Sequence, residues 1–246
     1  MMIPKLIIFF WVTLFCQLFA GAYFFDFPDD GTREAAVAVD TYHEHALKSL
    51  DYYINVSMPG YLRKSITNER LYNEPDGKHL VIGKYSFQWM EGPPFETENP
   101  LHFCLNANNR GFFTIQLHGG VVGYTRDGRF RIDHQGRLVT LSGNYPVLGQ
   151  EGFIQVTNNG PYTVSRAGGF YSDDDYIDTM KITVFKYFGQ MDDALNSISS
   201  TIFVLSEEIE VEEGPEHYKI LQGFISQSNS FTSKDSWFYK SVHQSV

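Results

Sequence analysis

One segment near the start of the chain has the hydrophobic spacing of an amphipathic helix. Thr32 can cap its first turn, where Glu34 complements the helix dipole. Pro59-Gly60 ends the segment, because proline disfavours helix in the residue before it. The apolar positions form a narrow seam like that of a coiled coil, so we predict a helix over 32–54 that needs a partner helix. The seam consists of Ala36, Val39, Ala46, Leu50 and Tyr53.

Further along, short segments rich in β-branched and aromatic residues recur about every 8–12 residues, as in all-β domains. Turn dipeptides such as Asp127-Gly128 and Asn159-Gly160 separate them and supply the positive φ angles of tight hairpins. No helical pattern lies between them to make crossovers, so we predict an antiparallel β domain. The predicted strands are 79–89, 101–105, 112–117, 121–125, 129–133, 137–141, 152–157, 162–165, 179–188 and 202–204.

The rest of the chain is polar or only weakly patterned. Apart from the strand at 79–89, residues 61–100 are rich in turns, and 217–246 shows weak helical spacing. The acidic run 207–216 lacks the ligand spacing of a calcium loop, so we interpret it as a solvated loop or edge. Four parts are therefore expected: a signal segment, an N-terminal helical segment with its junction, a β domain, and a C-terminal segment with a shortened helix. Their ranges are 1–22, 23–63, 64–216 and 217–246.

The first 22 residues have the order of a secretory signal. One positive charge at Lys5 precedes an apolar run, and Ala20-Gly21-Ala22 supplies small residues before the expected cleavage point. The apolar run is short of the roughly 20 residues that span a bilayer as a helix. Two alternatives remain open: an uncleaved N-terminal anchor, and lipid attachment at Cys16. The expectation is export to the periplasm, with cleavage after Ala22.

Composition limits the classes of function. The chain has 246 residues and a formal charge of −10, which disfavours sequence-independent binding to nucleic acid. Its aromatic content of 16% is too high for a disordered chain. After signal removal Cys104 would be the remaining cysteine, and we interpret it as a buried thiol in a strand.

The sequence offers little for chemistry. It contains no nucleophile elbow, no phosphate-binding loop and no zinc-protease motif. His43 and His45 would lie on different faces of the predicted helix, which makes a poor metal pair. A pair of carboxylates that converge in space remains possible. We expect a protein that is not an enzyme, with no cofactor, no metal and no small-molecule substrate.

An ordered series of motifs in the β region is similar to the central β domain of the bacterial flagellar rod and hook protein family. The series runs from a Gly-Phe-Phe segment through Tyr-Thr-Arg-Asp-Gly-Arg-Phe to a following Gly-Arg-Leu-Val segment. The residues of this fold motif are Gly111, Phe112, Phe113, Tyr124, Thr125, Arg126, Gly128, Phe130, Gly136, Leu138, Val139 and Gly143.

Two flanking segments resemble the same family. Residues 55–63 are similar to the junction that follows the family's N-terminal helix, and 220–229 to the start of its C-terminal helix. The resemblance implies a mainly β fold, with a rod/hook-type antiparallel β domain flanked by N- and C-terminal helical segments. The implied assembly residues are Val39, Ala46, Leu50, Tyr53, Asn55, Val56, Ser57, Pro59, Gly60, Tyr61, Gln222, Gly223, Ser228 and Asn229.

The resemblance also implies a function. In that family the terminal helices pair as a coiled coil and the β domain packs against neighbouring subunits, in assemblies that do not close. The implied partners are flagellar rod, hook, basal-body or filament proteins, with self-association possible. The secretory signal favours a periplasmic relative attached to the flagellum over a standard rod subunit. An alternative is a periplasmic or surface β-rich module that binds a glycan or a protein.

Overall fold

The computed structural model describes residues 47, 50, 53–72, 79–156, 160–212 and 214–230. The chain divides into two compact units, Met1–Ala46 and Leu47–Val246, and all described residues belong to the second unit. The predicted signal segment, most of the predicted helix, and Val39 and Ala46 within it therefore lie outside the described residues. Within the described ranges, no helix combines the length and the apolar character needed to cross a bilayer.

The N-terminal helix ends at Asn55, one residue beyond the predicted end. The Met58 amide donates to the Asn55 carbonyl at 2.9 Å, and the Tyr61 amide donates to the Met58 carbonyl at 3.1 Å. These two turns carry the chain through Pro59 into the β region. The predicted combination of a helix end and a Pro-Gly turn is therefore present.

A two-stranded antiparallel hairpin follows, formed by β1 (Lys64–Tyr72) and β2 (His79–Phe87). β2 was predicted, whereas β1 was not. The sequence Lys-Ser-Ile-Thr-Asn-Glu-Arg carries few apolar residues, so hydrophobic alternation does not mark it as a strand. Its extended form comes from continuous backbone pairing with β2, from Lys64 opposite Phe87 to Tyr72 opposite His79.

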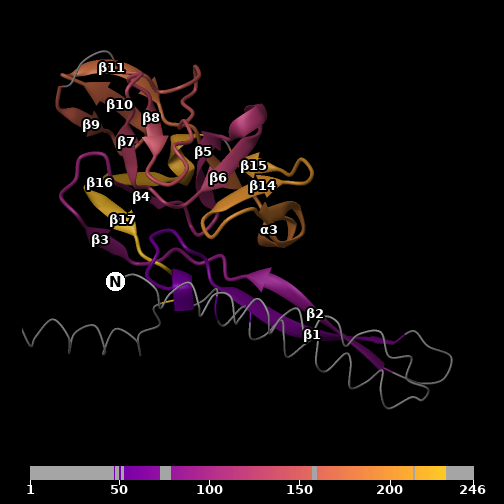
Figure 1. The fold of residues 1–246 in the computed structure, drawn as a ribbon. Coiled ribbons are helices and arrows are strands. Elements are labelled where there is room, and N and C mark those ends of the chain that lie inside the picture. The colour runs from indigo at the N-terminus through magenta and orange to yellow at the C-terminus, as the bar shows by residue number, and fades with distance from the viewer. Residues whose placement is uncertain are drawn as a thin grey trace, which may run out of the picture. The chain divides into compact units, whose positions relative to one another are not determined.

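The largest sheet has six antiparallel strands in the order β13-β14-β6-β5-β12-β15. Figure 1 labels β5, β6, β14 and β15 of this sheet. β5 and β6 form its centre and are joined by the short 3-10 helix η2 (His118–Gly120). β5 is buried along nearly its whole length, so both faces of the sheet are covered there. The strands are β5 (Gly111–Gln116), β6 (Val122–Thr125), β12 (Ile182–Phe185), β13 (Leu195–Ser197), β14 (Ile202–Leu205) and β15 (Val211–Glu212).

Neighbouring phenylalanines of β5 belong to two separate hydrophobic clusters, because successive side chains of a strand point to opposite faces. Phe113 belongs to the larger cluster, with Phe103, Phe130 and Phe170. Phe112 belongs to the smaller cluster and lies 5.8 Å, ring centre to ring centre, from Phe203. Strand alternation thus gives the β domain a core on each side of its main sheet.

Smaller sheets and one helix complete the middle of the domain. α3 (Phe188–Ala194) connects β12 to β13. A two-stranded sheet pairs β7 (Phe130–Ile132) with β8 (Leu138–Thr140). A three-stranded sheet has the order β11-β10-β9, from β9 (Tyr162–Val164), β10 (Gly169–Ser172) and β11 (Asp175–Thr179).

The last described strands pair with segments from the beginning of the β domain. After η3 (Pro215–His217), β16 (Lys219–Gln222) pairs with β4 (Phe103–Asn106). β17 (Phe224–Ser226) pairs with β3 (Pro94–Glu96). The expectation of helical spacing from residue 217 is therefore wrong over 219–226, where backbone pairing with β3 and β4 and burial of Ile220 and Ile225 stabilise strands instead. Residues from 231 onward lie outside the described residues.

Two other strand predictions need correction. In the described part of the predicted strand 152–157, residues 152–156, there are only isolated bridges, such as Leu148 opposite Phe153. The predicted strand 179–188 is divided between β11, β12 and the start of α3. The division occurs because the Met180 amide donates to Gly168, whereas the Lys181 amide donates to Leu148, so the chain changes partners there.

Candidate assembly junction

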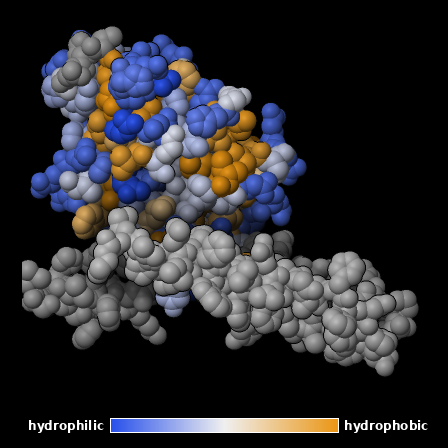
Figure 2. Space-filling model, in the orientation of Figure 1, coloured by the Kyte–Doolittle hydropathy of each residue, from blue (hydrophilic) through white to orange (hydrophobic). Residues whose placement is uncertain are grey.

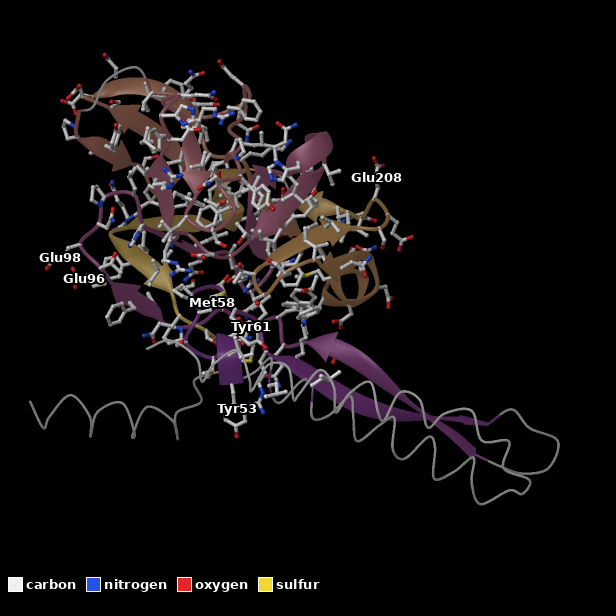
Figure 3. All side chains as sticks on the ribbon, viewed as in Figure 1. Tyr53, Met58, Tyr61, Glu96, Glu98 and Glu208 are labelled. Carbon is white, nitrogen blue, oxygen red and sulfur yellow. The ribbon has the colours of Figure 1, made fainter. Side chains whose placement is uncertain are left out.

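The two ends of the β domain meet at one place. The Gly60 amide donates to the Ser226 carbonyl at 2.9 Å, and the Asn229 amide donates to the Tyr61 carbonyl at 3.3 Å. We define the assembly junction as residues 55–63 with residues 226–230. Figure 3 shows Met58 and Tyr61 in this region, with Tyr53 pointing away from the β domain. The junction therefore holds the end of the N-terminal helix beside the beginning of the C-terminal segment.

Through its side-chain amide, Asn229 connects its own segment to two other segments of the chain, one before β1 and one after β2. Its Oδ1 accepts from the Arg63 amide at 2.7 Å. Its Nδ2 donates to the Gln88 carbonyl at 2.5 Å and to the Met90 carbonyl at 3.1 Å. An amide that both donates and accepts can make this set of bonds, which a carboxylate of the same shape cannot.

Gly60 allows the junction to lie directly on the main fold. Its φ of 73° is in the left-handed region, and a Cβ there would lie 2.4 Å from the Asp127 amide nitrogen. Any side chain would therefore force the N-terminal turn away from the loop that carries Arg126 and Asp127. Close backbone contact is the reason for glycine at this position.

Arg126, next to this contact, is a buried cation with 4% of its surface exposed. Its Nη2 donates to the Asn109 carbonyl, and its guanidinium lies 4.7 Å from the centre of the Phe112 ring. Burial lowers its pKa to about 10, while the Glu91 charge acts in the opposite direction, so the side chain remains charged at neutral pH. Among the described residues, its Nε and Nη1 have no hydrogen-bond partner.

Glu91 and Asn109 fix the loop beneath Arg126. The Glu91 Oε1 accepts from the Ala107 amide at 2.8 Å and from the Asn109 amide at 2.9 Å. The Asn109 Oδ1 in turn accepts from the Glu91 amide at 2.7 Å. These two residues, with Gln88 and Met90, were not predicted. Gln88 and Met90 act through backbone carbonyls, and Glu91 and Asn109 lie in polar stretches. No side-chain pattern therefore identifies these four residues in the sequence.

Gln222 and Gly223 lie outside the junction: Gln222 is the last residue of β16, and Gly223 connects β16 to β17. The Gln222 Oε1 accepts from the Val164 amide at 3.0 Å, and its Nε2 donates to the Pro100 and Tyr162 carbonyls. The Gly223 amide donates to the His102 carbonyl at 2.8 Å. These residues therefore hold β9 and the loop before β4 together. The resemblance implied that these residues begin a helix, but in the structure they do not.

At the helix end, apolar side chains are exposed. Leu47 exposes 53% of its surface, Leu50 56%, Tyr53 74% and Ile54 72%. Asn55, the next residue, is buried. Of the other junction residues predicted from the sequence, Ser57 is exposed, Val56 and Pro59 are half-buried, and Tyr61 and Ser228 are buried.

The fold-motif residues lie mostly in the interior and near close backbone contacts. A Cβ at Gly128 would lie 1.7 Å from the Phe103 carbonyl oxygen. The Thr125 hydroxyl donates to the Thr201 carbonyl at 2.8 Å. Cys104, in β4, is a buried thiol as predicted, and burial raises its pKa. The buried members of the motif are Gly111, Phe112, Phe113, Tyr124, Thr125, Arg126, Gly128, Phe130, Leu138 and Val139, while Gly136 and Gly143 lie in turns.

Fold and junction together define a mainly β domain whose first and last described segments meet. Residues 107–151 match the family described as the flagellar hook protein FlgE/F/G D1 domain. This segment contains the fold motif from Gly111 to Gly143. The predicted resemblance to the flagellar rod and hook family is confirmed for the central β region.

Individual proteins similar to this chain are also flagellar basal-body rod proteins. The chain is 40% identical over 67 residues to the flagellar basal-body rod protein FlgG of Buchnera aphidicola subsp. Schizaphis graminum, which covers 22% of this chain and 25% of that protein. It is 42% identical over 81 residues to the flagellar basal-body rod protein FlgF of Caulobacter vibrioides, 32% of this chain and 31% of that protein. A FlgF of Buchnera aphidicola subsp. Baizongia pistaciae is 25% identical over 138 residues, 54% of this chain and 51% of that protein. The matches thus span between a quarter and about half of these relatives.

Proposed function

We propose that this protein is a non-enzymatic structural component of the bacterial flagellum, or a periplasmic attachment to it, associated with the rod, the hook or the basal body. The observation that carries the proposal is the assembly junction, which brings both ends of the β domain together beside a helix end with exposed Leu47, Leu50 and Ile54. Apolar residues at helical spacing gain most of their stabilisation when another helix covers them. A second copy, or a related subunit, supplies that helix.

The names of the relatives support the location in the flagellum. Those with the matched segments are basal-body rod proteins. The surface of the β domain supports contacts with neighbouring subunits: Figure 2 shows orange, hydrophobic patches among polar residues on its visible face. Val121, Leu141 and Phe153 are among its exposed large apolar residues. Contiguous exposed apolar surface is typical of protein interaction sites.

The route to the flagellum is a further part of the proposal. Residues 1–22 have the charge, apolar run and small residues of a secretory signal, so the protein enters the periplasm by the general secretory route with cleavage after Ala22. N-terminal sequencing of the protein from a periplasmic fraction checks this step, with Tyr23 expected as the first residue. A first residue of Met1 would contradict the proposed cleavage.

Fractionation tests the proposed structural role. We expect the protein to be recovered with purified basal bodies, and a deletion strain to lose motility on soft agar. Expression of the full chain from a plasmid restores both in the deletion strain and serves as the control. Absence from basal bodies and filaments, together with normal motility of the deletion strain, would refute the proposal.

A further inference from the structure

A groove of about 580 Å³ lies between the β10–β11 hairpin, β12 and the turn that follows β15. Its size falls within the range of roughly 300–1,000 Å³ that is usual for small-molecule sites. Three tyrosines, Tyr171, Tyr176 and Tyr218, contribute to its lining, together with several hydroxyl and amide side chains. The groove is separate from the assembly junction and has no part in the function proposed above.

The backbone N–H and C=O groups of Ile182 face this groove. The Lys181 carbonyl, just before β12, accepts from the Thr114 amide, and the Phe185 amide donates to the Arg110 carbonyl. The odd-numbered residues from Lys181 to Phe185 therefore bond on the side of β5. Because bonding directions alternate along a strand, the N–H and C=O of Ile182 point to the opposite side. Ile182 lines the groove. Within residues 160–212 and 214–230 no backbone hydrogen bond to Ile182 lies on this side, and the described pairing with β15 runs as far as Val184 opposite Glu212.

This open position is one residue wide. On one side of it the Met180 amide donates to the Gly168 carbonyl at 2.8 Å, and on the other side Val184 pairs with β15. An added peptide strand would need several consecutive free positions along the edge. A compact ligand with a donor and an acceptor close together fits better, and neighbouring hydroxyls of a sugar ring have that arrangement.

The tyrosines nearby are held in fixed orientations. The Tyr176 and Tyr171 rings pack edge to face with centres 5.6 Å apart, and the Tyr176 hydroxyl lies 2.9 Å from the Thr179 hydroxyl. Tyr176 nevertheless exposes 54% of its surface, so its ring can contact a ligand. A rigid amphipathic ring offers an apolar surface at a low cost in conformational entropy.

Charge contributes little to the groove. Glu212 is paired with Arg110, with both carboxylate oxygens 3.1 Å from guanidinium nitrogens, and Lys181 is exposed. The described lining residues therefore include no cluster of cations or anions of the kind that a strongly charged ligand requires. Hydroxyl groups and aromatic surface dominate its chemistry.

From this geometry we propose that the groove binds a neutral oligosaccharide, with a sugar ring against Tyr176 and neighbouring ring substituents bonded to the N–H and C=O of Ile182. Binding is a property of the β domain itself. It would give a flagellar subunit a contact with glycan in its surroundings, and it neither requires nor excludes assembly through the junction.

Titration calorimetry on the full chain tests this proposal, with tetramers of β-1,4-linked N-acetylglucosamine and of β-1,4-linked glucose as probes. We expect at least one of them to bind with a Kd below about 1 mM, that is, about 4 kcal/mol of binding free energy. A neutral, capped tetrapeptide is the third probe. Failure of both sugars to bind at 10 times that concentration, or preferential binding of the peptide, would overturn the proposal.

Variants locate the site. Tyr176→Ala is expected to weaken sugar binding about tenfold, whereas Tyr187→Ala, at a tyrosine with 50% exposure outside the groove, leaves it unchanged. Ile182→Pro removes the N–H that faces the groove and is expected to weaken binding at least as much, while Ile182→Val retains it. Circular dichroism confirms that each variant is folded. Equal binding by Tyr176→Ala and by the unchanged protein would also overturn the proposal.

Discussion

In the β domain, Phe112 and Phe113 are completely buried, whereas at the end of the N-terminal helix Leu50 and Ile54 expose 56% and 72% of their surfaces. The β domain covers its own apolar residues, because strand alternation distributes them between two cores within one chain. The helix end has the same kind of residues without such cover. Because burial of apolar surface contributes about 25 cal/mol per Å², this difference favours association of the helix end with another chain.

The largest expected effect is the loss of stability caused by a substitution that disrupts packing inside the β domain. In Gly128→Ala the new methyl group would lie 1.7 Å from the Phe103 carbonyl oxygen, so the backbone must shift. We expect a loss of about 3 kcal/mol or more of unfolding free energy, measured by urea denaturation. Gly189→Ala, which meets nothing within 4 Å in α3, is the control and should be neutral or stabilising by less than about 1 kcal/mol. Equal urea midpoints for the two variants would contradict the packing described.

A smaller effect is expected at the assembly junction. Asn229→Ala removes the side-chain bonds to Arg63, Gln88 and Met90 and leaves their backbone groups without this partner. We expect a loss of about 2 kcal/mol in unfolding free energy. The exposed Asn196 provides the control: Asn196→Ala should change stability by less than about 0.5 kcal/mol. A loss as small as that of the control would show that Asn229 does not hold the two ends together.

The smallest effect concerns pH. Burial, and then the charge of Arg129, lower the pKa of His102 below its usual 6.5, and its Nδ1 lies 2.9 Å from the Thr97 hydroxyl. The unfolded chain therefore binds this proton more readily than the folded chain, so folding stability falls as the pH decreases through 6.5. His102→Gln should reduce the change in urea midpoint between pH 7 and pH 5. An unchanged pH dependence would show that His102 does not contribute to it.

The sequence was sufficient to predict elements in which propensity and turn chemistry agree. β5 and β6 combine β-branched and aromatic residues with flanking glycines, and both were found close to the predicted positions. β1 and β16 were missed because long-range pairing, and not local hydrophobic alternation, makes them strands. A weak helical pattern from residue 217 was overridden in the same way by pairing with β4.

The junction could be predicted only in part. The resemblance drew attention to Gly60 and Asn229, and the structure joins their segments through hydrogen bonds. Gln88 and Met90 take part through carbonyl oxygens that every residue possesses, so the sequence carries no signal for them. The groove next to Ile182 is lined by residues of β10, β11, β12 and β15, so it is a property of the assembled sheets.

We infer that the β domain buries its own apolar residues, whereas the helix end needs another chain to cover them. The most direct test is the recovery of Leu50→Asp with purified basal bodies. We expect its recovery to fall about tenfold relative to the unchanged protein, since a charge in a helix contact costs more than about 1.4 kcal/mol. Its urea midpoint should remain unchanged, and Leu50→Met should be recovered normally. Full recovery of Leu50→Asp, or unfolding of its β domain, would contradict the account.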